Sequence, residues 1–388
     1  MSRSSFVIIL ALLAALMGFT ALRIGAPDLL GVDAVSADYM IFHQVGELSR
    51  LGRAGEAYDA EAFRVFQQAR TGSSIFMTWT YPPHFNLALH PFARLPPALG
   101  YLLFTGLGFA LFLWSMFRLA PGAARPILLL CLPAITMNLL TGQNGFLTGA
   151  LMALTCHFAL TGAPVKGGLA LGLLTYKPHL GLGLGLAALL RGGLRLWGTA
   201  ALVLGLLALL ATLAYGPQIW QALAGSVETS GELLASARYK LERMSTVFAL
   251  TASLGLAPEL AMLLQMLAAL AGLGLVAFAA LRGWQLASVL CLGILSGTMT
   301  SPYAYDYDLC LLAPALALAW QPIRETLSPA ARALLGAGVL LSGGYGLGTV
   351  IFSDALKSVE ITPPSLGGIG LLIALALIVT ALARAERT

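Results

Sequence analysis

The first polar segment of this chain, residues 31–59, gathers titratable side chains directly after an apolar N-terminal run. Asp38 is followed by Tyr39 and Phe42, which places its carboxylate at the edge of an apolar medium, where partial desolvation favours a general base. The same position suits the N-cap of a surface helix, and the sequence leaves both interpretations open. Asp33 is the rival acid, but it lies closer to the apolar run, which favours a capping or solvated role.

Lys177 and His179, next to Tyr176, interrupt a second apolar region between residues 167 and 191. An unpaired cation is costly in an apolar region, so ionisable groups there more often serve function than they do in water. An ammonium group near the end of a half-helix suits a phosphate or pyrophosphate. The alternative is a lysine that snorkels beside a kink. We favour the phosphate interpretation.

Two further segments carry polar groups beside apolar runs. Gln143 and Asn144 begin such a run, and their amides can cap a helix or hydrogen-bond a sugar hydroxyl. Residues 301–308, SPYAYDYD, place Asp306 and Asp308 among three tyrosines. An aromatic belt at the membrane surface explains the tyrosines but not the acids. The cations that one of these acids can pair with are Lys177, Arg238, Lys240 and Arg243.

The elements that position these residues must be membrane helices. The chain has 388 residues, 58% of them hydrophobic and 10% charged, and its mean hydropathy is +0.85. A soluble protein of this size could not cover its surface with so few charges. The net charge of +5 comes largely from short loops between apolar runs, which indicates orientation in the membrane and no nucleic-acid partner. The four cysteines lie in apolar runs without paired spacing, which argues against a zinc site.

A window of about 20 residues for one bilayer crossing divides the chain into apolar runs. Proline at 178 breaks the region 167–191 into two half-helices. We therefore expect an all-α, polytopic, single integral membrane domain over residues 1–388, with about twelve transmembrane helices and a retained first helix. The other runs lie near 5–22, 97–118, 126–140, 145–161, 195–215, 258–281, 284–299, 307–321, 331–351 and 366–383.

The basic residues orient this arrangement. With the N-terminus inside, most loops that carry Arg and Lys fall on the cytoplasmic side, as the positive-inside rule requires. The opposite, exoplasmic face then receives the first outer loop, 23–96, in which residues 37–70 should form amphipathic surface helices. It also receives 142–144, 216–257 and 301–308. We expect the polar groups on this face to form one site at the surface of the plasma membrane.

Several motifs occur in a characteristic order. They are D-Y-x-x-F at 38–42, G-x-x-Y-D at 55–59, YPP-x-F at 81–85, PFARLP at 91–96, N-L-L-x-G-Q-N at 138–144, YKPH at 176–179 and SPY at 301–303. Together they resemble glycosyltransferase family 87, polytopic enzymes of the GT-C type that are similar to polyprenyl-phosphate-mannose-dependent alpha-mannosyltransferases. The resemblance runs over roughly residues 6–320. Each motif alone is weak, and their order carries the resemblance.

The resemblance implies an enzyme that moves a hexose, mannose or a related sugar, from a polyprenyl phosphate donor to a lipid or glycan hydroxyl on the outer face of the membrane. Asp38 matches the place of the general base. Independently of the resemblance, no metal or other cofactor is expected, because a cation can stabilise the departing phosphate, but Asp306 and Asp308 leave a metal site open as the alternative. Lys177 matches the donor-phosphate contact, with His179 where Gln is more usual. The remaining assignments are Tyr81 and Tyr303 for the phosphate, and Gln143, Asn144, Tyr39, His84 and Asp306 for the sugar or acceptor.

Two other classes of protein fit part of the pattern. A transporter or flippase for a lipid-linked saccharide would also show many spans, few charges and a broken helix. Such a protein concentrates ionisable groups within its spans, whereas this chain places Asp38, Asp59 and Asp306 toward one outer face. A catalytically inactive scaffold of envelope assembly is the third interpretation. The placement of the acids favours the transferase.

Overall fold

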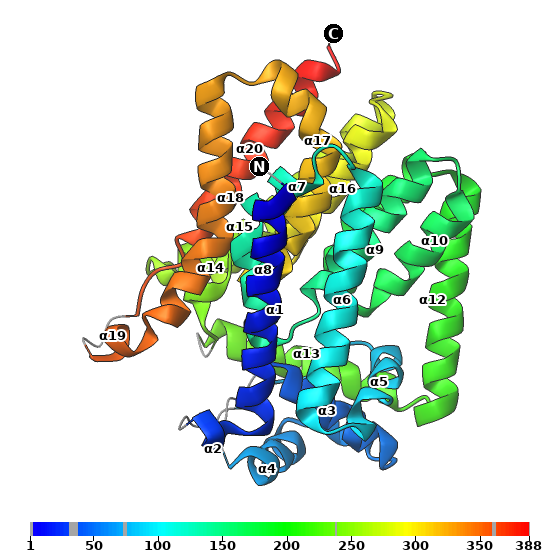
Figure 1. Cartoon of the computed structure of the whole chain (residues 1–388). Coiled ribbons are helices and arrows are strands. Elements are labelled where there is room, and N and C mark those ends of the chain that lie inside the picture. Colours follow the sequence, from blue (N-terminus) through cyan, green and yellow to red (C-terminus); the bar gives the residue numbers. More distant parts are fainter. Residues whose placement is uncertain (1–2, 31–37, 73–75, 237–238, 359–361, 388) are drawn as a thin grey trace. The chain divides into compact units, whose positions relative to one another are not determined.

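The structure is a computed structural model that describes residues 3–30, 38–72, 76–236, 239–358 and 362–387 (Figure 1). Within these ranges every regular element is a helix, and the only extended pairing is an isolated bridge between Met244 and Tyr305. The expected all-α fold is therefore confirmed. Asp33 and Arg238 lie outside the described residues.

Six helices in the described ranges are long and apolar enough to cross a membrane, or seven if a bent pair counts as one. The pair is α7 (Ala124–Leu130) and α8 (Leu132–Thr141), which meet at 66°. The expected number of about twelve is not confirmed, because several of the apolar runs form helices shorter than a full crossing. The six are α1 (Arg3–Gly25), α6 (Pro97–Leu119), α12 (Gly193–Tyr215), α15 (Pro258–Leu281), α18 (Pro329–Ile351) and α20 (Gly367–Ala385).

The shorter apolar helices include α9 (Gly145–Leu160) and α16 (Leu286–Thr300). Residues 164–191 form three pieces: α10 (Pro164–Leu173), a 3-10 turn η3 (Leu174–Tyr176) and α11 (Pro178–Arg191). Lys177 stands between the last two with φ −128° and ψ 68°, outside the helical region. Pro178 takes the first position of α11, where its missing N–H would have no intrahelical partner. The polar residue therefore sits where the backbone leaves the helix.

The chain divides into two compact units, each described here by itself. Unit 1 contains Met1–Ala110, Asn138–Asn144 and Leu202–Arg238, and unit 2 contains Leu111–Met137, Gly145–Ala201 and Tyr239–Thr388. The single membrane domain over residues 1–388 stays a prediction.

Unit 1 is organised around α3 (Asp38–Arg50), which packs against α5 (Pro83–Leu89), η1 (Ala54–Tyr58) and η2 (Phe92–Arg94). α3 has buried side chains at successive turns, including Phe42, Val45 and Leu48. α4 (Ala60–Thr71) follows η1, and α13 (Ile219–Ala235) packs on η1 and α5. The remaining short helix between α1 and α6 is α2 (Pro27–Leu30), which contacts α1. The helices α3, α4, α5, η1 and η2 thus form a compact group.

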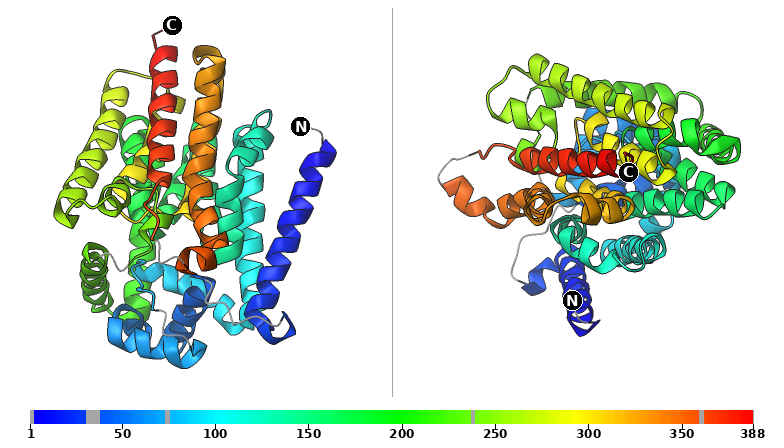
Figure 2. Two further views of the ribbon diagram at one scale, coloured as in Figure 1. Left: turned by 90° about the vertical axis from the view of Figure 1, so that its left-hand side faces the viewer. Right: turned by 90° about the horizontal axis from the view of Figure 1, so that it is seen from above.

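Unit 2 is built on close helix pairs. α11 packs against α16, where a Cβ on Gly183 would lie 1.6 Å from Ser296 Oγ, so only glycine allows this approach. α18 and α20, orange and red in Figure 2, lie side by side. Around them lie η4 (Leu241–Arg243), α14 (Val247–Ser253), η5 (Asp306–Leu311), α17 (Leu312–Thr326) and α19 (Ser353–Ser358). η4 and η5 carry the charged residues described below.

Candidate active site

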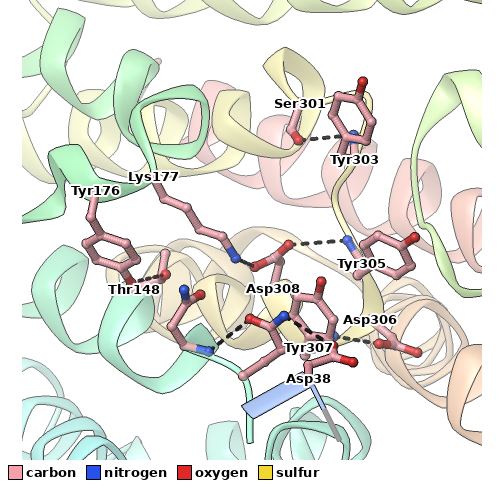
Figure 3. A network of polar contacts seen from close by, with 12 residues as sticks. Asp38, Thr148, Tyr176, Lys177, Ser301, Tyr303, Tyr305, Asp306, Tyr307 and Asp308 are labelled. Atoms are coloured by element: carbon pink, nitrogen blue, oxygen red, sulfur yellow. Dashed lines mark hydrogen bonds and ion pairs between the residues drawn. The ribbon is translucent and has the colours of Figure 1, made fainter. Parts of the chain in front are cut away.

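Asp38 is the first residue of α3 and is half-buried. Its Oδ2 atom accepts a hydrogen bond from Gln143 Nε2 at 3.1 Å, across 105 residues of sequence (Figure 3). A carboxylate in the first turn of a helix is also stabilised by the partial positive charge of the helix N-terminus. Unit 1 therefore brings together the predicted base and the predicted sugar-binding amide.

The turn that presents Gln143 depends on Gly142. This glycine has φ 68°, in the left-handed region that favours glycine. A Cβ at this position would lie 2.6 Å from Tyr39 Cβ and 2.9 Å from the ring of Tyr101. Because residue 142 has no Cβ, the turn can pack directly against Tyr39, the residue that follows Asp38. Local sequence and packing together place Gln143 beside the first turn of α3.

The Gln143 amide is oriented by two donors. Its Oε1 atom accepts from Tyr81 Oη at 3.4 Å and from the Asn144 backbone N–H at 3.2 Å. With its oxygen engaged in this way, the NH₂ group points to Asp38. We call these four residues, Asp38, Tyr81, Gln143 and Asn144, the Asp38 group.

Aromatic packing fixes Tyr81. Phe42 meets the rings of Trp79, Tyr81 and Phe85 edge-on at 5.7 to 5.8 Å between centroids. Tyr58 Oη donates to the Tyr81 carbonyl at 2.8 Å. Edge-to-face pairs of this kind add specificity to apolar burial. The D-Y-x-x-F and G-x-x-Y-D motifs therefore supply the contacts that hold the Y-P-P segment.

Tyr39 and His84, both assigned to the sugar or acceptor, are buried in unit 1. Tyr39 is 0% exposed, its ring packs edge-on against Tyr101, and burial raises the pKa of its hydroxyl. His84 is 6% exposed, and burial lowers its pKa to about 4, so its ring is neutral near pH 7. Among the described residues neither the Tyr39 hydroxyl nor the His84 ring nitrogens have a hydrogen-bond partner. Their roles in binding stay predictions.

Unit 2 holds a buried ion pair between Lys177 and Asp308. Lys177 Nζ donates to Asp308 Oδ1 at 2.5 Å, and the two side chains are 6% and 3% exposed (Figure 3). Asp308 Oδ2 accepts the backbone N–H of Tyr305 at 3.3 Å. The break before α11 and the acidic segment of η5 therefore meet, although 131 residues separate them.

A second buried pair joins Arg243 of η4 to Asp306. The guanidinium donates from Nε and Nη2 to the two carboxylate oxygens, at 3.0 and 2.9 Å. Asp306 is 0% exposed, and its Oδ1 atom also accepts the backbone N–H of Tyr307 at 2.8 Å. We call Lys177, Arg243, Asp306 and Asp308 the ion-pair network. The sequence singled out Arg243 only as one of several cations near the acids.

Tyrosine rings line this network. The Tyr305 and Tyr307 rings stack at 5.3 Å. Lys177 Nζ and the Arg243 guanidinium lie 5.3 and 5.9 Å from the centroid of Tyr307, within the range of a cation–π contact. In the described ranges no cluster of three or more His, Cys, Asp or Glu side chains could hold a metal ion.

The other predicted residues of unit 2 lie near this network in sequence. The Tyr303 backbone N–H donates to Ser301 Oγ at 3.2 Å, and its ring meets Tyr239 edge-on. His179 is half-buried in the first turn of α11, and its carbonyl accepts Thr300 Oγ1 at 2.6 Å. The phosphate-binding roles of Tyr303 and His179 stay predictions.

The comparisons with known proteins bear on both units. The family model of glycosyltransferase family 87 matches residues 79–302, more than half of the chain. The matched range includes Tyr81, Gln143 and Lys177, while Asp38 and Asp306 lie outside it. A search of curated proteins and of solved structures found no match. On the strength of the family match, this chain belongs to glycosyltransferase family 87.

Proposed function

We propose that this membrane glycosyltransferase moves a hexose, mannose or a related sugar, from a polyprenyl phosphate to a lipid or glycan hydroxyl on the exoplasmic face of the plasma membrane. Asp38 is the general base of the proposal, and Lys177 contacts the phosphate of the donor. The shorter apolar helices α9, α10, α11, α16 and α17 would complete a bundle of about twelve spans.

The observation that carries this proposal is the hydrogen bond from Gln143 to Asp38. A general base must keep its negative charge and point a lone pair at the proton it removes. An amide donor fixes the direction of a carboxylate without adding a positive charge beside it. The Asp38 group thus has the composition that base catalysis requires.

The proposed reaction is a single displacement. The acceptor hydroxyl gives its proton to the Asp38 carboxylate as its oxygen attacks the anomeric carbon. The bond from that carbon to the phosphate oxygen breaks, its electron pair leaves with the polyprenyl phosphate, and the configuration inverts. Lys177 stabilises the charge that develops on the leaving phosphate.

A transfer assay with purified protein in lipid vesicles tests the proposal. The substrates are radiolabelled polyprenyl-phosphate sugars with extracted membrane lipids as acceptors, and a labelled glycolipid is the expected product. Asp38→Asn should reduce its rate of formation by about 10² to 10⁴. Asp59→Asn is the matched control, because Asp59 in unit 1 caps α4 through Ala62 N at 2.8 Å and Asn caps equally well. Movement of a lipid-linked saccharide across the vesicle without any product would support the flippase instead.

Topology is tested separately. Arg50 at the end of α3 is exposed, and the proposal places it on the exoplasmic side of the membrane. Arg50→Cys should react with an impermeant thiol reagent added to intact cells. Reaction only after the cells are permeabilised would show that residue 50 lies on the cytoplasmic side.

A further inference from the structure

The lysine assigned to the donor phosphate already has a counter-ion in unit 2. Lys177 Nζ lies 2.5 Å from Asp308 Oδ1, and both side chains are buried. A phosphate that reaches this ammonium group must therefore compete with a carboxylate. We propose that Asp308 is an exchangeable counter-ion, which occupies Lys177 until the donor phosphate replaces it and recovers Lys177 as the polyprenyl phosphate leaves. This inference rests on the proposed function.

The two pairs of the network differ in how readily they can exchange. Arg243 grips Asp306 with two parallel N–H donors, and Asp306 also accepts the Tyr307 amide. Such a bidentate pair is rigid and strong. Lys177 meets Asp308 through one ammonium contact at the end of a flexible stem. In the proposal, therefore, the Lys177–Asp308 pair exchanges its anion, while the Arg243–Asp306 pair stays intact and holds the segment that carries Asp308.

Asp308 remains held when it releases the ammonium group. Its Oδ2 atom accepts the Tyr305 N–H at 3.3 Å, and its own N–H donates to the Tyr305 carbonyl at 2.9 Å. The carboxylate can thus stay within its own turn, close to the lysine that it must recover. The Tyr307 ring centroid lies 5.3 Å from Nζ, and this cation–π contact helps to hold the ammonium group in place during the exchange.

The charges explain why exchange is useful. The donor is a phosphodiester with a single negative charge, as a carboxylate has, so the ammonium group contacts one singly charged anion before and after exchange. The product is a phosphomonoester, which carries more negative charge near pH 7 and attracts the lysine more strongly. A competing carboxylate promotes release of that product, a step that limits the turnover of many enzymes. Asp308 is thereby a positioning residue that acts through Lys177.

Binding of farnesyl phosphate, a short polyprenyl phosphate, to the detergent-solubilised full chain tests this inference by calorimetry. Asp308→Asn should lower the Kd at least about tenfold, because a buried ammonium without its partner gains most from a new anion. Lys177→Met in the Asp308→Asn background should abolish the gain. Asp308→Glu keeps the carboxylate and should bind like the wild type. Asp59→Asn is the control, since it removes an acid outside the ion-pair network and leaves the α4 cap in place.

The inference fails if Asp308→Asn binds no more tightly than the wild type, if the gain survives Lys177→Met, or if Asp59→Asn shows the same gain. Asp308→Ser, measured in the same way, replaces the Asn variant if that variant does not fold. The binding assay needs no sugar transfer, so it separates the two proposals. A gain in a protein that transfers no sugar supports the counter-ion and refutes the function, whereas transfer by the wild type without a gain in Asp308→Asn refutes the counter-ion alone.

Discussion

The two units hold their acids in opposite ways. In unit 1, Asp38 is half-buried and receives a hydrogen bond from the neutral amide of Gln143. In unit 2, Asp306 and Asp308 are almost fully buried, and each lies against a cation. A buried carboxylate needs a cation to offset its desolvation, and that cation occupies an oxygen that a general base would use. This difference is consistent with the proposed roles, in which Asp38 of unit 1 accepts the proton and Lys177 of unit 2 binds the phosphate.

The strongest test of this contrast replaces one acid in each unit. Asp38→Asn should lower the rate of transfer by about 10² to 10⁴, the usual contribution of a general base, with little change in thermal stability. Initial rates with a saturating donor and unfolding midpoints of the same preparations provide the measurement. Full turnover by this variant would end the assignment of Asp38 as the base.

The converse change in unit 2 should act mainly on stability. Asp306→Asn leaves the Arg243 guanidinium buried without its acid, which should cost about 3 to 5 kcal/mol. Thermal unfolding in detergent measures the loss, and Asp59→Asn on the surface of unit 1 is the control, with a midpoint near that of the wild type. An Asp306→Asn protein as stable as the wild type would show that the network is not a structural element.

The pH dependence of stability tests whether unit 1 buries His84 in its neutral form, in contrast to the charged side chains that unit 2 buries as pairs. The pKa of His84 is about 4 in the folded chain and about 6.5 when unfolded. Between these values the unfolded chain binds a proton that the folded chain does not, so this contribution to stability is complete above pH 6.5 and is lost as the pH falls toward 4.

His84→Phe should remove this dependence, which amounts to at most about 3 kcal/mol. Unfolding midpoints of both proteins between pH 4.5 and 7.5 test it. The difference between the two proteins should narrow or reverse at low pH, where the wild type is weakened. Parallel curves would mean that His84 is not a buried neutral group.

The smallest expected effect concerns the orientation of the base. Gln143→Leu should reduce transfer about tenfold, because Asp38 loses the donor that directs it. Gln143→Glu places a second carboxylate beside Asp38 and should raise the pKa of Asp38 in that variant. The acidic limb of the rate profile should then move to higher pH, which a purely structural role of Gln143 would not cause. If the acidic limb does not move, Gln143 does not act on the Asp38 carboxylate.

Much of the architecture was predictable because it depends on local chemistry. Composition alone indicates a membrane protein, and Pro178 marks the place where the helix breaks at Lys177. The number of spans was harder to predict. An apolar window measures the length of a run, whereas a crossing needs an unbroken helix, and the bend between α7 and α8 and the break at Lys177 shorten the helices.

The sequence by itself determined the residue types of the site: an acid after the first apolar run, an amide pair after Gly142, a lysine before proline and two acids among tyrosines. It also indicated the family, since the motifs and their order can be read without coordinates. Only the tertiary structure decided the partners within each unit. Gln143 reaches Asp38 across 105 residues, Lys177 reaches Asp308 across 131, and Arg243 reaches Asp306 across 63. Partners this distant in sequence are selected by the packing of whole helices and by the cost of burying an unpaired charge, and neither is encoded in a local spacing.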